Sequence, residues 1–272
     1  MNLFNRKLLI PFKSKKIFKV ICGLSNVNIN ELINTIKAAE LANANYIDLV
    51  ANTKIVSIVK NITNLPICVS SIDPIELYNC ILAGADLVEI GNFDSFYKKN
   101  ILFSPSQILE LAKETRRLIK SKDICVTIPY TLKLIEQVSL AKQLESIGIN
   151  IIQTEGCNIY NSNSYSSKNS QIMKSAINAS YSLCSTYVVS NSVNIPVITS
   201  SGLDLISSSI AFYCGASGIG IGSNIIKQKN IYDMYLYINE IRNSINIQFN
   251  NHNFQAVYLS MSEKIKKKST IN

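Results

Sequence analysis

Short apolar runs alternate with longer amphipathic segments along most of the chain. Four runs share one pattern, in which a segment ending in small residues leads into a short apolar stretch: 42–48, 83–89, 147–153 and 214–220. Four further runs alternate with these: 20–23, 67–70, 124–127 and 197–200. Glycine after a helix permits the left-handed turn that returns the chain to a strand. The pattern therefore predicts eight short strands separated by helices.

The amphipathic segments are the predicted helices, and they occupy 29–42, 53–61, 74–83, 105–120, 132–147, 171–190, 205–213 and 231–247. Two of them begin with a capping signal, Asp73 before Pro74 and Ser104 before Pro105. Strict alternation favours a parallel sheet, and eight units in about 230 residues favour its closed form. We therefore predict an α/β fold, a single (β/α)₈ TIM barrel. A doubly wound open sheet is the alternative, but no G-x-G-x-x-G motif follows the first strand.

The barrel is expected to occupy residues 17–248, between a basic N-terminal segment, 1–16, and a basic flexible tail, 249–272. The irregular segment 156–170 is rich in Asn, Ser and Tyr and is interpreted as either a disordered insertion or an active-site lid. No apolar run approaches the roughly 18 residues of a membrane span. The start of the chain lacks the apolar stretch of a secretory signal. We therefore expect neither a membrane span nor export.

The formal net charge of +9 is concentrated at the two ends. Residues 1–20 carry six basic residues and no acid, and 253–272 carry four lysines against Glu263. These ends account for the whole excess, so the body between them is neutral. Basic ends can add weak, salt-dependent attraction to RNA or anionic membranes. The chain lacks a recognised nucleic-acid module, so no specific nucleic-acid partner is predicted.

Cysteine and histidine usage narrows the chemistry. The seven cysteines form no C-x-x-C pair, and Cys22, Cys68 and Cys125 lie in strand-like runs. They are interpreted as small buried apolar residues in a reducing compartment. The single histidine, His252, lies in the tail. This position argues against histidine zinc sites, Ser-His-Asp triads and histidine bases in the body.

Polar residues recur at one position of otherwise apolar strands. Aligning alternate strands places Asp48, Glu89 and Gln153 at equivalent positions, and Glu155 lies two residues after Gln153. Side chains two apart share a face of a strand, and barrel enzymes take their catalytic groups from the carboxyl ends of the strands. We predict that these four residues face the barrel mouth as catalytic groups. The alternative is a structural hydrogen-bond network that closes the top of the barrel.

Lys19 lies between apolar residues in the first predicted strand. A lysine inside a barrel needs a partner, and Asp48 on the next strand could supply it. Lys19 is predicted to act as a Schiff-base nucleophile, a proton carrier or a phosphate counter-ion. If the strand begins later, Lys19 is a solvated edge residue instead. If the acids gather without the lysine, Mg²⁺ bridging them to a phosphate becomes plausible, although no metal-binding motif predicts a metal site.

Two glycine-serine turns form a predicted anion site. The seventh strand ends at Ser201 and Gly202, and the eighth ends at Gly222 and Ser223. Glycines let backbone N–H groups approach an anion, serine hydroxyls add donors, and a short helix near Asn224 would direct its positive end inward. These four residues are the predicted phosphate-binding set. The alternative is a pair of tight turns that need glycine for their geometry.

Several stretches resemble a known family: Asp48, 84–97, 153–156 and 200–203. The chain resembles the hypothetical chloroplast reading frame twenty-three family of algal plastids and cyanobacteria, from about Lys19 to Ser223. This resemblance implies a phosphate-binding TIM barrel in the plastid stroma and implies no particular activity. The run from Lys19 to Leu24 also resembles the first strand of phosphoribosylanthranilate isomerase. One extra residue puts Lys19 and Cys22 on opposite strand faces, so that reaction is not predicted.

Two functions remain open from the sequence. The first is an enzyme of lyase or isomerase type that acts on a small phosphorylated metabolite by proton transfer or carbon–carbon chemistry. The second is a non-catalytic sensor that binds a phosphorylated ligand or flavin mononucleotide through the same loops. The sequence predicts no oligomeric state.

Overall fold

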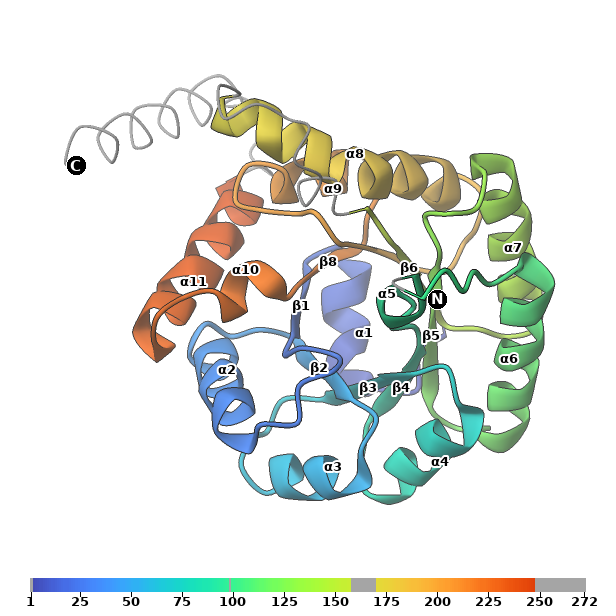
Figure 1. Ribbon diagram of the computed structural model, residues 1–272, viewed down its shortest axis with the longest axis horizontal. Coiled ribbons are helices and arrows are strands. Elements are labelled where there is room, and N and C mark those ends of the chain that lie inside the picture. Colours follow the sequence, from blue (N-terminus) through green and yellow to red (C-terminus); the bar gives the residue numbers. More distant parts are fainter. Residues whose placement is uncertain (1, 98, 158–169, 248–272) are drawn as a thin grey trace.

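The computed structural model, which describes residues 2–97, 99–157 and 170–247, contains a closed barrel of eight strands (Figure 1). All neighbouring strands are parallel, and β1 pairs with β8 to close the ring. In chain order the strands are β1 (Ile17–Ile21), β2 (Tyr46–Val50), β3 (Ile67–Ser71), β4 (Leu87–Ile90), β5 (Asp123–Ile128), β6 (Ile151–Thr154), β7 (Val197–Ser200) and β8 (Gly218–Ile221). The predicted (β/α)₈ barrel is confirmed, and the open-sheet alternative is wrong.

Helices surround the barrel, and each of the predicted helical segments contains one (Figure 1). They are α2 (Ile29–Leu41), α3 (Thr53–Lys60), α4 (Pro74–Leu82), α6 (Pro105–Leu118), α7 (Leu134–Ser146), α8 (Gln171–Ser190), α9 (Ser208–Tyr213) and α11 (Ile231–Ile247). Three further helices lie at the ends of the barrel: α1 (Arg6–Lys13), α5 (Asp94–Tyr97) and α10 (Ser223–Ile226).

The two capping signals fix helix starts as expected. The Asp73 carboxylate accepts hydrogen bonds from the backbone N–H groups of Ile75 and Glu76, which makes Asp73 the N-cap of α4. Ser104 forms a capping box with Gln107 at the start of α6. These caps satisfy N–H groups that have no partner within the helix.

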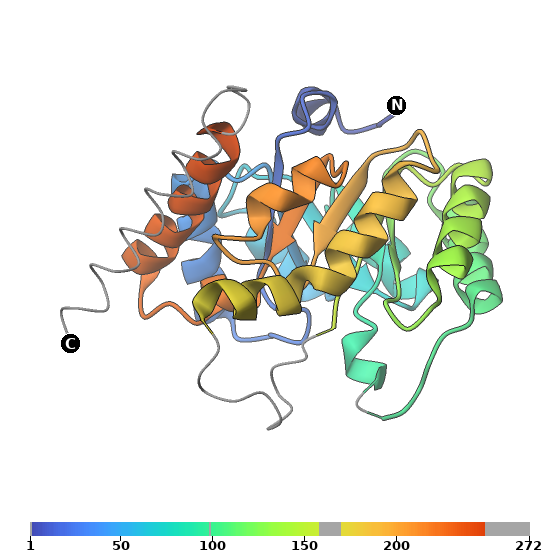
Figure 2. The ribbon, with the colours of Figure 1, turned by 90° about the horizontal axis from the view of Figure 1, so that it is seen from above.

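The basic N-terminal segment is an ordered element. Helix α1 closes the amino-terminal end of the barrel (Figure 2), and Leu8 and Phe12 are buried there against the lowest layer of inward-facing side chains. The Asp123 carboxylate accepts hydrogen bonds from the backbone N–H groups of Phe4 and Asn5, at 2.9 and 2.8 Å. The N-terminal segment is ordered although it is strongly basic, because two apolar side chains one helical turn apart pack into the end of the barrel.

The core has two parts. One lies between the strands and the outer helices, and the other fills the lower barrel interior beneath α1. Cys22, Cys68 and Cys125 are buried and free, as expected for small apolar core residues. Cys22 belongs to the outer core whereas Lys19 points inward, so the two lie on opposite faces of β1 as predicted.

Two predicted segments lie wholly or mostly outside the described residues. Residues 158–169, most of the segment interpreted as an insertion or lid, lie outside the described residues, as does the tail from 248 onward. Among the helices that the structure describes, none has the length and hydropathy that crossing a membrane requires.

Candidate functional site

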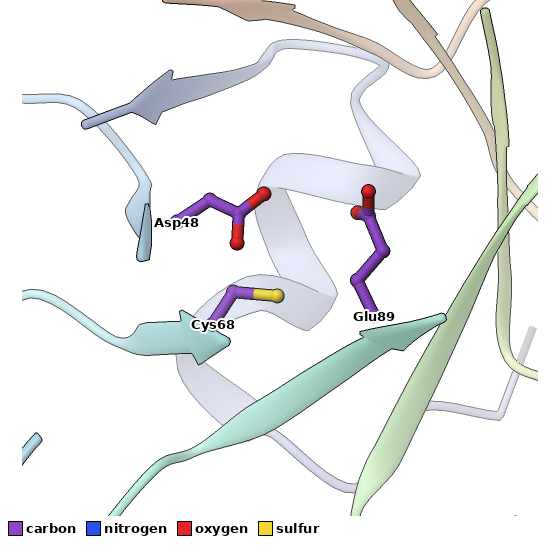
Figure 3. A group of neighbouring side chains, drawn as sticks. All are labelled: Asp48, Cys68 and Glu89. Atoms are coloured by element: carbon purple, nitrogen blue, oxygen red, sulfur yellow. The ribbon is translucent and has the colours of Figure 1, made fainter. Parts of the chain in front are cut away.

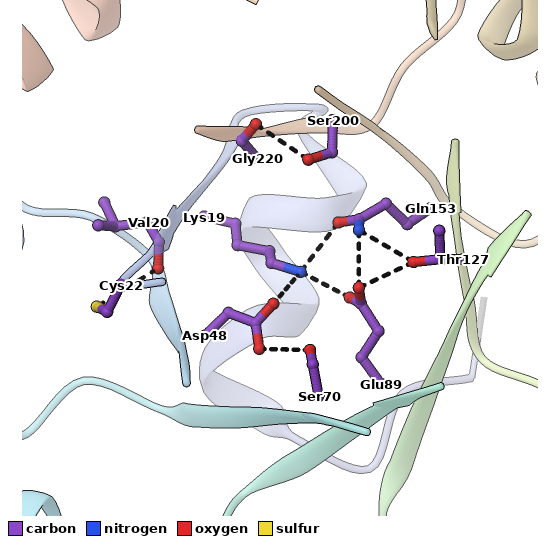
Figure 4. A network of polar contacts seen from close by, with 10 residues as sticks. All are labelled: Lys19, Val20, Cys22, Asp48, Ser70, Glu89, Thr127, Gln153, Ser200 and Gly220. Carbon is purple, nitrogen blue, oxygen red and sulfur yellow. Dashed lines mark hydrogen bonds and ion pairs between the residues drawn. The ribbon is translucent and has the colours of Figure 1, made fainter. Parts of the chain in front are cut away.

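A ring of polar groups occupies the middle of the barrel interior, with one side chain from each of β1 to β7 and the backbone carbonyl of Gly220 from β8 (Figure 4). We call this group the polar ring: Lys19, Asp48, Ser70, Glu89, Thr127, Gln153, Ser200 and Gly220. All of its members are buried. Burying unpaired polar groups is costly, so the mutual hydrogen bonds of the ring are necessary for the fold as well as available for chemistry.

The ammonium group of Lys19 lies inside the ring. Its Nζ is 2.6 Å from Asp48 Oδ2 and 2.6 Å from Glu89 Oε2, and it donates to Gln153 Oε1 at 2.9 Å (Figure 4). The side chain is 0% exposed. The predicted Lys19–Asp48 pair is confirmed, and the interpretation of Lys19 as a solvated edge residue is wrong. Glu89 reaches the same ammonium from the non-adjacent strand β4.

Further hydrogen bonds fix the two carboxylates. Glu89 Oε1 accepts from Gln153 Nε2 at 2.7 Å and from Thr127 Oγ1 at 2.9 Å. Asp48 Oδ1 accepts from Ser70 Oγ at 2.7 Å. Gln153 therefore directs its carbonyl oxygen to the ammonium and its NH₂ group to a carboxylate, which determines its orientation. The charged groups are held in place before any ligand arrives.

For both Lys19 and Glu89, burial and the charge of the ion-pair partner shift the pKa in opposite directions. Burial by itself lowers the pKa of Lys19, but the Asp48 and Glu89 carboxylates outweigh it and hold the pKa well above the ordinary lysine value. Burial raises the pKa of Glu89, while the Lys19 ammonium opposes that rise. Lys19 therefore remains an ammonium at neutral pH, and Glu89 is the group better suited to exchange a proton.

Asp48, Cys68 and Glu89 also form a group of possible metal ligands (Figure 3), with ligand atoms within 4.8 Å of one another. Lys19 Nζ already contacts both carboxylates. Burial holds the pKa of the Cys68 thiol well above its ordinary value, which opposes the thiolate that a metal ion needs. The arrangement fits an ammonium ion rather than a metal ion, and the Mg²⁺ considered for acids without a lysine is disfavoured.

Glu155 lies one layer above the polar ring and is 6% exposed. Its Oε2 accepts hydrogen bonds from the Tyr97 hydroxyl at 2.7 Å and from the Tyr130 backbone N–H at 3.4 Å. The two tyrosine rings pack edge to face, with centroids 5.3 Å apart. Tyr97 comes from α5, so this short helix positions the upper carboxylate.

The two glycine-serine turns lie together. Ser201 and Gly202 both have positive φ, 66° and 72°, and the Asn224 side-chain NH₂ donates to Leu203 O at 3.0 Å, linking the two loops. Among the described residues, the backbone N–H groups of the four predicted phosphate-binding residues donate to no backbone acceptor. Helix α10 begins at Ser223, as predicted for a short helix near Asn224, and has four residues.

One cavity of about 300 Å³ opens at the carboxyl end of the barrel. Its lining includes most predicted site residues: Glu89, Gln153, Glu155, Ser201, Gly202, Gly222 and Ser223. Lys19 and Asp48 are absent from that lining and are fully buried, and Lys19 contacts the lining residues Glu89 and Gln153. A Cβ atom on Gly91 would lie 2.9 Å from Glu89 Oε1, so glycine at this position leaves room for the Glu89 carboxylate.

Sequence reasoning missed Ser70, Thr127 and Ser200, which complete the polar ring. Each ends one of the short apolar runs on the odd-numbered strands, so aligning those runs as well could have found them. Tyr97 was also missed. No pattern marks it, because it reaches Glu155 from a four-residue helix.

Substituting Gly202 tests the turn after β7. In the Gly202→Ala variant the new Cβ would overlap the Asn178 carbonyl oxygen, in addition to the strain of a positive φ. Gly148→Ala is the matched control, because Gly148 also has positive φ but nothing lies within 4 Å of its Cβ position. We expect Gly148→Ala to lower the free energy of unfolding by about 1–2 kcal/mol and Gly202→Ala to lower it more, as measured by urea denaturation. Equal losses would contradict the close packing of this turn against α8.

Two sequence relatives align with most of this chain. The protein named "Uncharacterized protein ycf23" from Antithamnion sp. is 49% identical over 245 residues, covering 89% of this chain and 88% of the relative. The protein of the same name from Porphyra purpurea is 42% identical over 259 residues, covering 93% and 96%. Genes named ycf23 are plastid-encoded, which supports a plastid location for this chain.

Solved structures with the same fold are distant in sequence. The 3-hexulose-6-phosphate synthase from Salmonella typhimurium superposes with a TM-score of 0.62 at 11% identity, covering 84% of this chain and 98% of that one. The (S)-3-O-geranylgeranylglyceryl phosphate synthase from Thermoplasma acidophilum gives 0.60 at 14% identity, covering 90% and 98%. These likenesses establish the fold alone. Residues 3–251 match the family described as "Protein of unknown function (DUF561)", and the chain belongs to that family.

Proposed function

We propose that this protein is an enzyme that binds a small phosphorylated metabolite at the barrel mouth and transfers a proton on it. The observation that carries the proposal is the cavity itself. Its upper wall has two turns whose backbone N–H groups lack backbone acceptors among the described residues, and its lower part contains the Glu89 carboxylate. A phosphate bound at the turns would hold the rest of the ligand above a group suited to acid–base chemistry.

The phosphate assignment rests on backbone geometry. Gly202 and Gly222 have no side chain, so a phosphate oxygen can approach their N–H groups closely, and the Ser201 and Ser223 hydroxyls add donors. Two structural neighbours are named for phosphorylated compounds, which supports this assignment. One is a synthase of a hexulose phosphate, and the other was solved in complex with the substrate sn-glycerol-1-phosphate.

The charged residues on the opposite side of the cavity indicate the chemistry of the part of the ligand that carries no phosphate. Among the described residues of the lining, Glu89 and Glu155 carry charge and none is basic. A second anionic group on the ligand would be repelled there, whereas hydroxyl groups would donate to the carboxylates. The ligand is therefore a phosphorylated polyol or hydroxyketone rather than a phosphorylated acid.

We assign a role to each charged residue of the polar ring. Glu89 reaches the cavity and exchanges the proton, Gln153 and Thr127 orient it, and Lys19 with Asp48 tunes its charge from beneath. A Schiff-base role for Lys19 is disfavoured because the amine is fully buried and its pKa is raised. Such an enzyme would be of the isomerase or lyase type. We place it in the plastid stroma, where phosphorylated metabolites are dissolved.

Ligand-induced thermal stabilisation tests the binding step. We expect glycerol 1-phosphate at saturating concentration to raise the melting temperature by a few degrees, and glycerol to have no effect. Ser223→Asp puts a carboxylate at the turn and should abolish the shift. Ser95→Asp adds the same charge to another part of the lining and should retain most of it. Equal losses in both variants, or no shift with any phosphorylated polyol, would contradict the assigned phosphate site.

A further inference from the structure

The outward face of α1 has a pattern that neither the barrel nor the cavity requires. Leu8 and Phe12 point into the barrel end, and the opposite face presents Arg6, Ile10 and Lys13 at helical spacing. Ile10 is 75% exposed, more than any other large hydrophobic residue of the described chain. Phe4, just before the helix, is 51% exposed. An exposed apolar residue between two cations offers the two interactions by which helices bind a membrane interface, apolar burial and attraction to anionic headgroups.

This face is held rigidly. The Asp123 carboxylate binds the backbone N–H groups of Phe4 and Asn5, and the Asn150 side chain donates to Asn2 O at 3.0 Å. The buried Leu8 and Phe12 fix the rotation of the helix about its axis. No ordering of a disordered segment is therefore needed for binding, which favours affinity.

The surroundings of α1 are basic. Lys7, Lys13, Lys15 and Lys16 are exposed within or just after the helix, and Lys120 and Lys122 lie in the segment before Asp123. Three acids near this end have partners within the protein: Asp123 accepts from the N-terminal segment, Asp86 pairs with Lys60 at 2.9 Å, and Glu40 accepts from Thr63 and Asn64. The exposed lysines and arginine outnumber them. The amino-terminal end of the barrel therefore presents positive charge around Ile10 and Phe4.

We propose that α1 docks this protein onto an anionic phospholipid surface, with Ile10 and Phe4 entering the interface and the surrounding lysines and Arg6 contacting lipid phosphates. Figure 2 shows α1 at one end of the barrel, and the cavity opens at the other. The docked protein would keep its mouth open to the aqueous phase. This inference is independent of what the cavity binds.

Other partners fit the same face less well. A second copy of the chain would bring two positive surfaces together. Nucleic acid would neutralise the lysines but would give Ile10 no apolar environment. A lipid surface satisfies both parts of the pattern, because it offers phosphates and an apolar layer beneath them.

Vesicle co-sedimentation with the full chain tests the proposal. We expect the protein to pellet with vesicles of phosphatidylglycerol and phosphatidylcholine in equal parts, and not with phosphatidylcholine alone. Each basic residue at an anionic surface strengthens binding about fivefold, so the double variant Arg6→Glu/Lys13→Glu should bind at least about 25-fold more weakly. Ile10→Ser should weaken binding about tenfold. All three sites are exposed, so circular dichroism should be unchanged.

The matched control is Lys54→Glu/Lys142→Glu, which makes the same change in net charge at exposed positions of α3 and α7. It should bind vesicles nearly as well as the wild type. Equal losses in the two double variants would overturn the proposal, because they would show binding by net charge alone. So would undiminished binding by Ile10→Ser, or binding to single-stranded RNA with none to vesicles.

Discussion

Replacing Lys19 with methionine is expected to lower the free energy of unfolding by about 3–5 kcal/mol at neutral pH. Methionine approximates the length of the lysine stem, so the main loss is the ammonium that lies 2.6 Å from both the Asp48 and the Glu89 carboxylates. Without it, two acids remain buried with no cation between them. Urea denaturation followed by circular dichroism measures the change.

The pH dependence of the Lys19→Met variant gives a second readout. Burial already raises the pKa of Glu89 in the wild type, where Lys19 opposes the rise. In the variant that opposition is gone, so the native state binds protons that the unfolded chain releases. A native state that binds more protons gains stability as the pH falls. The deficit relative to the wild type should therefore shrink as the pH falls from neutral toward the ordinary glutamate range.

Lys113→Met is the control for a lysine in an exposed ion pair. Its Nζ lies 2.8 Å from Glu110 Oε1, but both side chains are largely in solvent. Its loss should change the free energy of unfolding by no more than about 0.5–1 kcal/mol. Adding Asp48→Asn to Lys19→Met should restore part of the lost stability by removing one uncompensated charge. A Lys19→Met variant as stable as the wild type would show that the ion pairs do not hold the polar ring together.

The barrel could be predicted from the sequence because one structural unit recurs with local start signals. Asp73 and Pro74 fix the start of α4, and Pro66 directly precedes β3, so these boundaries follow from local chemistry. Helix α1 could not be predicted in the same way. Its stability comes from Leu8 and Phe12 packing against side chains of strands far away in the chain, and the lysines around them dominate the local pattern.

The site could be predicted only where contacts follow from strand order. Asp48 is on the strand next to Lys19, so that pair could be inferred, whereas Glu89 lies on β4 and reaches the ammonium across the barrel. Distances across a barrel depend on strand tilt and side-chain length, and a sequence pattern does not contain them. The roles of the site residues remain predictions: seven of them line one cavity, and Lys19 and Asp48 are buried in the polar ring beneath it.

Replacing Glu89 with glutamine is expected to slow proton exchange on a bound ligand by about 10²–10⁴-fold. Glutamine keeps the shape of the side chain but cannot accept the proton. Dihydroxyacetone phosphate in deuterated water is a suitable probe, because exchange of the hydrogens next to its carbonyl can be followed by nuclear magnetic resonance. In the wild type the exchange rate should rise with pH through the raised pKa of Glu89, since the carboxylate is the active form.

Comparison with two other carboxylates identifies the base. Glu76→Gln changes a residue bonded to Ser71 outside the cavity lining and should exchange at the wild-type rate. Glu155→Gln should retain more activity than Glu89→Gln, because Glu155 lies one layer above the polar ring, whereas side chains of the ring hold Glu89 in place. If Glu155→Gln is the slower variant, Glu155 is the base and Glu89 has a structural role. If the wild type is stabilised by phosphorylated ligands but exchanges no protons on any, the cavity belongs to a sensor, since binding at the two turns does not depend on the chemistry beneath them.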